Sequence, residues 1–179
     1  MKFCSACGAP ITMLTPVGDH LPRAVCTVCQ EIHYVNPKVV VGCVPQFEGR
    51  VLLCRRAIEP RKGFWTMPAG FMENGETARE GARRETLEET QAVATIGELI
   101  TMMSIPMMSQ VHMMFRAQLQ SDHHGATTES SEVRFFSEAE IPWGELAFPT
   151  VQHTLKHFFE DRARGVHALH IIDLGPIKI

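Results

Sequence analysis

The residues best suited to chemistry are carboxylates in one charged stretch, Gly70 to Ala92. Three of its glutamates, Glu85, Glu88 and Glu89, are spaced i, i+3 and i+4, so on an α-helix they project from one face. Like charges at this spacing destabilise an isolated helix, so the acidic face requires a counter-ion. A charged run alone more often marks a solvated surface helix, and its context must decide between that and a metal site.

Four cysteines near the N-terminus form a second set of candidate ligands. They occur as Cys4-x2-Cys7 and Cys26-x2-Cys29, with 18 residues between the pairs, which is typical of a tetrahedral zinc site. The alternatives are chance thiols or a redox motif, which would need only one pair. Four sulfur ligands leave no open coordination position, so we expect a structural zinc ion rather than a catalytic one. His33 is expected to pack or to link, not to ligate.

Composition limits the possible classes of protein. The chain has 179 residues, enough for one core with a small appendage or for two small domains. With 45% apolar and 21% charged residues and a net charge of −3, it is typical of a soluble globular protein, and nucleic acid is not an expected partner. Neither a membrane-spanning apolar run nor a secretion signal stands out. We therefore expect a cytoplasmic protein with free or metal-bound thiols.

The elements around the charged stretch can be read from the residue pattern. Two strands joined at Glu48-Gly49 are expected over Val39–Phe47 and Val51–Cys54. Thr77 and Glu80 form a capping box, which predicts a helix beginning near residue 78. Its thin apolar stripe of Ala78, Ala82 and Thr86 predicts close packing against a sheet.

Further elements follow the charged stretch. A loop is expected over 121–131 and a second helix from Pro149 to Gly165. The apolar tail 166–179 is expected to add a strand or to contact a second subunit. The predicted strands are Thr95–Ser104, Val111–Gln120 and Val133–Phe136.

The spacing Gly70-x5-Glu76-x7-Arg84-Glu85-x2-Glu88-Glu89 closely resembles the signature box of the Nudix hydrolases. The four-cysteine segment resembles that of the zinc-ribbon branch of this family. The resemblance implies an α/β (α+β) chain with a Nudix αβα sandwich, built on a mixed sheet, over 37–179. A zinc ribbon over 1–36 is expected to precede it.

Two positions depart from the family pattern. Thr86 stands where an aliphatic residue is usual, which costs little if its hydroxyl bonds the carbonyl four residues earlier. Gln91 stands where glycine would ease a left-handed helix end, at a cost of about 1 kcal/mol for other residues. The helix is therefore expected to run on or to unwind differently.

The resemblance also implies roles for individual residues. Glu85, Glu88 and Glu89, with the Gly70 carbonyl, would hold Mg²⁺ or Mn²⁺, and Arg84 would orient the acids through Glu76 or Glu88. The general base is a box glutamate, here Glu85, or one from a later loop, here Glu129 or Glu132, and we favour Glu85 as a ligand and Glu132 as the base. The expected substrate contacts are Arg55, Arg56 and Glu129, with Phe64 or Trp65 stacking on a base or lying in the core.

The substrate class rests on one downstream segment. At 104–110 the chain reads Ser-Ile-Pro-Met-Met-Ser-Gln and lacks the tryptophan and later prolines of the NADH-cleaving members. We therefore expect a pyrophosphohydrolase for FAD or ADP-ribose that releases AMP. The alternatives are NADH or the NAD cap of RNA, a non-catalytic ligand sensor, and a zinc-dependent scaffold. The expected partners are a small nucleotide and a second copy in a homodimer, without a membrane.

Overall fold

A computed structural model of the chain describes residues 1–175. It contains two compact units, Met1–Pro37 and a second unit that begins at Lys38. Within residues 1–175, no helix is long and apolar enough to cross a lipid bilayer.

The first unit is a small antiparallel sheet with few buried side chains. Its strands β1 (Ile11–Leu14), β2 (Arg23–Cys26) and β3 (Ile32–His33) pair in the order β1-β2-β3. The buried apolar residues of this unit are Cys4, Ala24, Val25 and Cys26. Two of these four are candidate zinc ligands, so the unit has almost no apolar core apart from its metal site.

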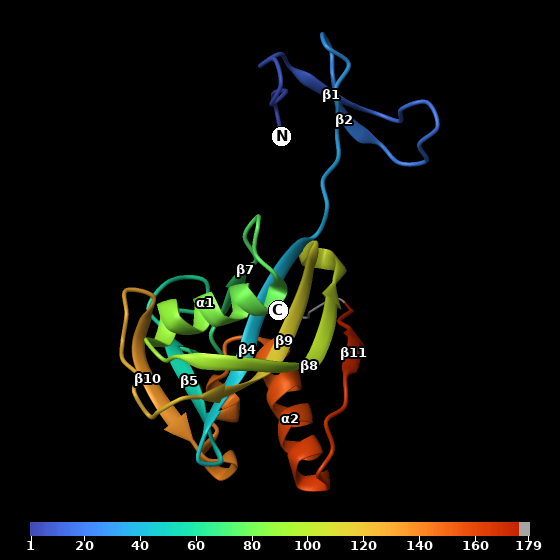
Figure 1. Cartoon of the computed structure of the whole chain (residues 1–179). Coiled ribbons are helices and arrows are strands. Elements are labelled where there is room, and N and C mark those ends of the chain that lie inside the picture. The colour runs from blue at the N-terminus through green and yellow to red at the C-terminus, as the bar shows by residue number, and fades with distance from the viewer. Residues whose placement is uncertain (176–179) are drawn as a thin grey trace. The chain divides into compact units, whose positions relative to one another are not determined.

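The second unit is a mixed sheet between two helices (Figure 1). The path of the sheet is β10-β5-β4-β9-β8-β11, with β4–β9 and β8–β11 parallel and the other pairs antiparallel. The helices are α1 (Ala78–Thr90) and α2 (Pro149–Arg164). Short 3₁₀ turns cover Pro106–Met108, Glu138–Glu140 and Trp143–Glu145. The strands are β4 (Lys38–Phe47), β5 (Arg50–Arg56), β6 (Trp65–Thr66), β7 (Ala69–Phe71), β8 (Ala94–Ile105), β9 (Gln110–Leu119), β10 (Ser130–Phe136) and β11 (His170–Asp173).

Alternate residues of the central strands supply two apolar layers, one on each face of the sheet. Val41 and Cys43 of β4 belong to the layer that includes Ala82 of α1. Val40 and Val44, their neighbours along the strand, belong to the layer with Leu155 and Phe158 of α2. The expected αβα sandwich with a mixed sheet is confirmed.

The ends of α1 follow local rules with one difference from expectation. Thr77 and Glu80 form both bonds of the capping box, as predicted. The hydroxyl of Thr86 donates to the Ala82 carbonyl at 2.7 Å. At the other end, Gln91 adopts the left-handed conformation, with φ of 58°, although it is not glycine. Its side-chain Nε2 donates to the Ala126 carbonyl at 2.7 Å, a bond that glycine could not make.

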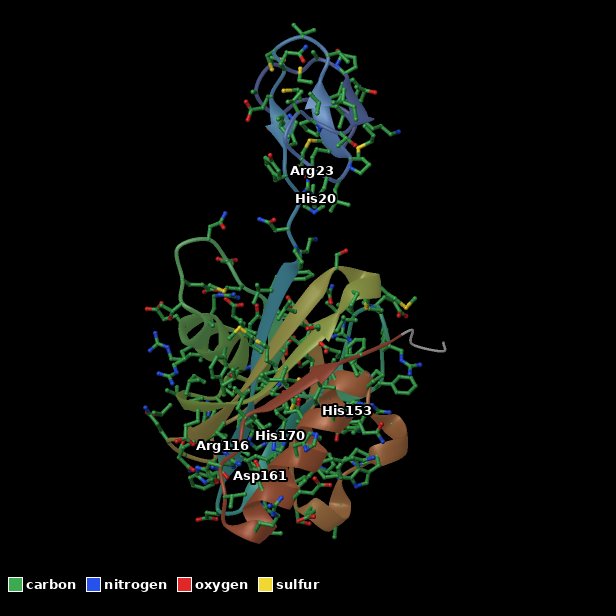
Figure 2. All side chains as sticks on the ribbon, turned by 90° about the vertical axis from the view of Figure 1, so that its right-hand side faces the viewer. His20, Arg23, Arg116, His153, Asp161 and His170 are labelled. Carbon is green, nitrogen blue, oxygen red and sulfur yellow. The ribbon has the colours of Figure 1, made fainter. Side chains whose placement is uncertain are left out.

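The C-terminal segment adds a strand, one of the two outcomes expected for it. β11 pairs in parallel with β8. Asp161 of α2 holds this segment by accepting hydrogen bonds from the Ala168 amide and from Nε2 of His170, both at 3.1 Å. Arg116 of β9 lies 3.7 Å from the same carboxylate (Figure 2). The last part of the predicted tail, 176–179, lies outside the described residues.

Strands β4 and β5 diverge, and this divergence creates the space for the site. Their register covers only Gln46↔Val51 and Phe47↔Arg50, next to the hairpin turn. Farther along, β4 pairs with β7 and β5 pairs with β6. The segment of Ala69 and Gly70 therefore runs inside the sheet, with β4 as its hydrogen-bonding neighbour.

Candidate active site

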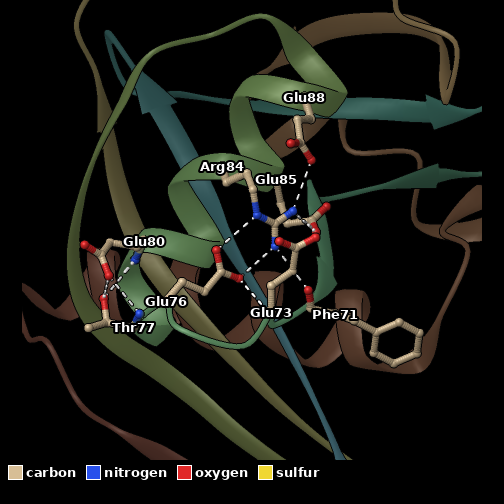
Figure 3. Close-up of polar contacts among 8 residues, drawn as sticks. All are labelled: Phe71, Glu73, Glu76, Thr77, Glu80, Arg84, Glu85 and Glu88. Carbon is tan, nitrogen blue, oxygen red and sulfur yellow. Dashed lines mark hydrogen bonds and ion pairs between the residues drawn. The ribbon is translucent and has the colours of Figure 1, made fainter.

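Arg84 forms the centre of a network of carboxylates (Figure 3). Its Nε and Nη2 donate to the two oxygens of Glu76 at 3.1 and 2.8 Å. Its Nη1 donates to Glu85 at 2.7 Å and to Glu88 at 3.1 Å, and Nη2 also reaches the Phe71 carbonyl at 3.1 Å. These bonds raise the pKa of Arg84 further and, with the Glu73 amide, hold the pKa of Glu76 at about 2. Arg84 thus fixes the directions of three acids from one position.

Glu85 lies against the backbone of Gly70. A Cβ atom at position 70 would overlap the carboxylate group of Glu85, so a larger residue would displace this carboxylate from its position. The Glu85 side chain is 12% exposed, and burial raises the pKa of its carboxylate even though Arg84 opposes the shift. Gly70 therefore serves the site through the absence of a side chain.

Glu89 is the most deeply buried acid of the group, with 7% of the residue exposed. Its Oε2 accepts a hydrogen bond from the Ala69 amide at 3.1 Å, and Sγ of Cys54 lies at 3.7 Å. Burial, with added repulsion from Glu85 and Glu129, raises the pKa of Glu89 to about 7. A buried carboxylate beside two others is stabilised by a cation.

The donor set fits a hard divalent cation. Carboxylate oxygens and a backbone carbonyl are the ligands that Mg²⁺ and Mn²⁺ prefer, and Mg²⁺ usually keeps several waters. Glu89 is buried and Glu85 is half-buried, whereas the side chain of Glu88 is 58% exposed. Among residues 1–175, no three carboxylates offer oxygens within 4.8 Å of one another. A cation held here would also need waters or substrate oxygens as ligands, as Mg²⁺ usually does.

Of the two later glutamates, Glu129 lies within electrostatic range of the carboxylates. Its negative charge contributes to the raised pKa of both Glu85 and Glu89. Glu132 instead lies 3.6 Å from Nη1 of Arg55. The choice of Glu132 as general base stays a prediction.

Trp65, expected as a possible stacking surface, lies in the core. It is 5% exposed and meets the ring of Phe136 edge-on at 4.9 Å, so a substrate base cannot stack on it. Phe64 is half-buried beneath the Arg61 guanidinium, 4.6 Å from the ring centre.

The two arginines at the end of β5 face different groups. Nε of Arg55 donates to the Gly63 carbonyl at 2.7 Å, and its Nη1 pairs with Glu132. Nε of Arg56 donates to the Pro60 carbonyl at 2.7 Å. The charge of Arg56 also lowers the pKa of Glu89, and its guanidinium lies over the Phe148 ring, 5.2 Å from the ring centre.

A cavity of about 220 Å³ lies next to the site, and sequence reasoning missed it. Gly70 lines the cavity and also contacts Glu85, so a single backbone segment separates the carboxylates from the cavity. The lining is mostly apolar and includes Val40, Phe148 and Met108, with His112 and Gln110 as polar groups. The alternation of β9 grouped His112 with Met114, but nothing in that pattern indicates a hollow.

The four cysteines of the first unit converge as predicted. Their sulfur atoms all lie within 4.8 Å of one another, with Cys7–Cys26 and Cys7–Cys29 at 3.5 Å. A tetrahedron with Zn–S bonds of about 2.3 Å has edges of about 3.8 Å, so the cluster fits zinc. His33 Nε2 lies 3.3 Å from Cys4 Sγ, where it bonds to a candidate ligand.

Comparison with known proteins agrees with this geometry. The NUDIX domain family matches residues 36–161, and the Nudix N-terminal zinc-ribbon family matches residues 2–35. A crystal structure of a NUDIX hydrolase from Nitrosomonas europaea has a TM-score of 0.92 and 51% identity, covering 97% of this chain and 100% of that chain.

Two relatives of named activity are more distant. An ADP-ribose pyrophosphatase of Methanocaldococcus jannaschii is 29% identical over 119 residues, which are 64% of this chain and 69% of that protein. An NAD-capped RNA hydrolase of Vibrio cholerae is 28% identical over 175 residues, 91% of this chain. The chain spans 61% of the length of the Vibrio protein.

The match to the NUDIX domain covers more than half of the chain, and the box carboxylates, their arginine and the glycine that admits Glu85 are all in place. The chain belongs to the Nudix hydrolase family of pyrophosphohydrolases and carries the family's N-terminal zinc ribbon.

Proposed function

We propose that this enzyme hydrolyses the pyrophosphate bond of an ADP-linked diphosphate such as ADP-ribose or FAD. Water would add across the P–O–P bond, giving AMP and the phosphorylated partner. The observation that carries the proposal is a pair of carboxylates, the half-buried Glu85 and the buried Glu89, one backbone segment away from an apolar cavity. The Methanocaldococcus relative, named an ADP-ribose pyrophosphatase, supports this substrate class.

The residues of the site would divide the work as follows. Glu85, Glu88, Glu89 and the Gly70 carbonyl would hold Mg²⁺ or Mn²⁺, which when bound neutralises phosphate charge and makes water a better nucleophile. Arg84 keeps Glu85 and Glu88 in position through its hydrogen bonds.

Glu129 is our candidate for the general base. Its charge acts on Glu85 and Glu89, whereas Glu132 is paired with Arg55. The charge of Arg56 also acts on Glu89, and its guanidinium is of the kind that binds a phosphate oxygen.

The first unit would have a structural role. We propose that Cys4, Cys7, Cys26 and Cys29 hold one zinc ion, which would leave no open position for a reactant. The homodimer expected from the sequence stays a prediction, for which light scattering of the purified protein is the measurement.

A second candidate function is the hydrolysis of NADH or of the NAD cap of RNA. The match to the Vibrio NAD-capped RNA hydrolase favours it, because that match extends over both units of the chain. Against it stands the segment 104–110, which lacks the tryptophan and prolines of the NADH-cleaving members.

Nucleotide release from a substrate panel tests the proposal. The protein is incubated with Mg²⁺ or Mn²⁺ and, separately, with ADP-ribose, FAD, NADH and dinucleoside polyphosphates. We expect metal-dependent release of AMP, fastest from ADP-ribose or FAD. Preferred cleavage of NADH would favour the second candidate function. If no compound is hydrolysed in a metal-dependent way, the proposed activity is wrong. Glu88→Gln is the negative control, in which hydrolysis should fall because one proposed metal ligand is lost. Since the Glu88 side chain is exposed, this change should not disturb the core.

A further inference from the structure

Gln91 ends α1, the helix of the box glutamates, in a backbone conformation that glutamine does not favour. Its φ of 58° and ψ of 8° lie in the left-handed region, which is costly for residues other than glycine. The side-chain Nε2 donates to the Ala126 carbonyl at 2.7 Å. A residue held in a disfavoured conformation by a bond to a distant segment calls for a functional explanation.

The bond from Gln91 joins α1 to the loop between β9 and β10. In the same loop, the Gly125 amide donates to the Thr90 carbonyl at 2.9 Å. The amide group of Gln91 also packs on Gly125, because a Cβ atom at position 125 would lie 3.0 Å from Cδ of Gln91. Two hydrogen bonds and one close contact therefore fasten this loop to the last turn of the helix that carries Glu85 and Glu89.

The turn that follows Ala126 is compact and leads directly to Glu129. Oγ1 of Thr127 accepts hydrogen bonds from the amides of Glu129 and Ser130 at 3.2 and 3.1 Å. The Thr127 amide donates to the Ser130 carbonyl at 2.8 Å, and the Ala57 amide donates to the Glu129 carbonyl at 2.7 Å. Because the turn is bonded within itself, a shift at Ala126 would be passed on to Glu129.

Glu129 directly precedes β10, next to the strand that reaches the acids. Ser130, the following residue, is buried and pairs with Arg56 of β5. Sγ of Cys54, on the same strand, lies 3.7 Å from Oε2 of Glu89. The charge of Glu129 contributes to the raised pKa of Glu89. The segment fastened to α1 thus carries a carboxylate within electrostatic range of the acids.

We propose that Gln91 is a positioning residue, which holds Glu129 in place for the hydrolytic reaction through its bond to the Ala126 carbonyl. The proposal rests on the proposed function, in which Glu129 is the candidate general base. Gln91 acts through the loop and not by contact with the substrate. Glycine at this position would ease the left-handed helix end, but it would release the loop, so the side chain accounts for the disfavoured backbone.

Two variants separate the hydrogen bond from the backbone conformation. Gln91→Gly removes the donor and eases the left-handed backbone, so its Tm should stay close to that of the wild type. Gln91→Met removes the donor but keeps a side chain of similar length in the left-handed conformation, so its Tm should fall. In both, kcat for metal-dependent release of AMP should fall by about three- to tenfold. KM and the Mg²⁺ dependence should not change, because Arg84 still holds the metal ligands.

A matched control and a double variant assign the effect to Glu129. Glu48→Gly also replaces a residue of positive φ, 47°, by glycine, but at the turn between β4 and β5, and it should leave kcat unchanged. Glu129→Gln should lower kcat by itself. Adding Gln91→Gly to Glu129→Gln should then lower kcat no further, because the residue that Gln91 positions has already lost its function.

Hydrogen exchange of the peptide that spans 122–131 supplies a measurement that needs no activity. Its amides should exchange faster in Gln91→Gly than in the wild type or in Glu48→Gly, because the loop has lost one of its bonds to α1. Equal exchange in the three proteins would overturn the proposal, since Gln91 would then not hold the loop.

The kinetic outcomes distinguish this proposal from the proposed function. A wild-type kcat in Gln91→Gly or in Glu129→Gln would overturn the positioning role and leave the pyrophosphohydrolase intact. A fall in Gln91→Met alone would assign the effect to the backbone, and an equal fall with and without Glu129→Gln would show that Gln91 does not act through Glu129. Absence of metal-dependent hydrolysis by the wild type would instead remove the proposed function.

Discussion

At the scale of single residues, Arg84 positions the acids of the site as well as neutralising their charge. The guanidinium donates to Glu76, Glu85 and Glu88 and also to the Phe71 carbonyl. A planar fork can serve several acceptors at fixed angles, whereas an ammonium group is a single point charge on a flexible chain. Arg84 therefore supplies geometry in addition to charge.

Arg84→Lys is expected to reduce kcat/KM for metal-dependent hydrolysis by roughly 10- to 100-fold, because one ammonium cannot orient Glu85 and Glu88 while holding Glu76. The measurement is the initial rate across a titration of Mg²⁺. Arg83→Lys is the matched control, since this exposed neighbour makes no ion pair among the described residues and should behave as wild type. Unchanged hydrolysis by Arg84→Lys would contradict the orienting role.

The conformation of a residue could be predicted from the sequence where it depends on neighbours within one helical turn, and not where it depends on distant segments. The capping box at Thr77 and the back-bond of Thr86 depend on residues within one helical turn, and the sequence predicts both. Gln91 was expected to alter the end of the helix, but a bond to the carbonyl of Ala126, 35 residues away, holds it in the left-handed conformation. The burial of Trp65 likewise depends on a strand distant in sequence.

At the scale of elements, the diverging strands β4 and β5 matter most. Gly42 of β4 lets the segment of Pro68 and Ala69 approach β4 closely, because a Cβ atom there would overlap Ala69 and the Pro68 carbonyl. Both strands, the capped helix and the box spacing could be predicted from the sequence. The cavity could not, because it is the space left between β4, β9 and the start of α2, and no single segment encodes it.

Asp161 connects α2 to β11, and its charge should make that connection sensitive to acid. Its carboxylate faces Arg116 of β9 and His170 of β11, and His170 in turn stacks on His157 of α2 at 3.9 Å. Burial alone would raise the pKa of Asp161, but the hydrogen bonds from His170 and the Ala168 amide outweigh it and lower the pKa. The folded-state pKa therefore lies below the unfolded value, which is about 3.9.

The sign of the pH dependence follows from this shift. Stabilisation by the Asp161 carboxylate is complete above the unfolded pKa of about 3.9 and is lost as the pH falls through the folded-state value. Asp161→Asn should lower the free energy of unfolding by roughly 1–3 kcal/mol at pH 7 and by less at pH 3. Urea unfolding at both pH values measures this. An equal loss at both would show that packing, not charge, is responsible.

At the scale of the whole molecule, the two units are stabilised by different means. The unit from Lys38 has two apolar layers on a mixed sheet, whereas the first 37 residues bury few side chains apart from their cysteines. A small unit without an apolar core depends on its metal, because the free energy of metal binding is then its folding free energy.

Removal of zinc by a strong chelator should therefore unfold Met1–Pro37 and leave the unit from Lys38 folded. Hydrogen exchange followed by mass spectrometry measures this for peptides of each unit separately. Amides of β1 and β2 should lose protection, while those of β4 and β9 keep it. Loss of protection throughout the sheet would mean that the second unit depends on the first.

The segment of Ala69 and Gly70 has one more consequence. The Ala69 amide holds Glu89, Gly70 admits Glu85, and the other side of the same segment lines the cavity. Because main-chain atoms of this segment separate the cavity from the acids, side chains that line the cavity can change without moving Glu85 or Glu89. Substrate preference can thus diverge during evolution at positions such as His112 and Met108 while the hydrolytic chemistry is inherited intact.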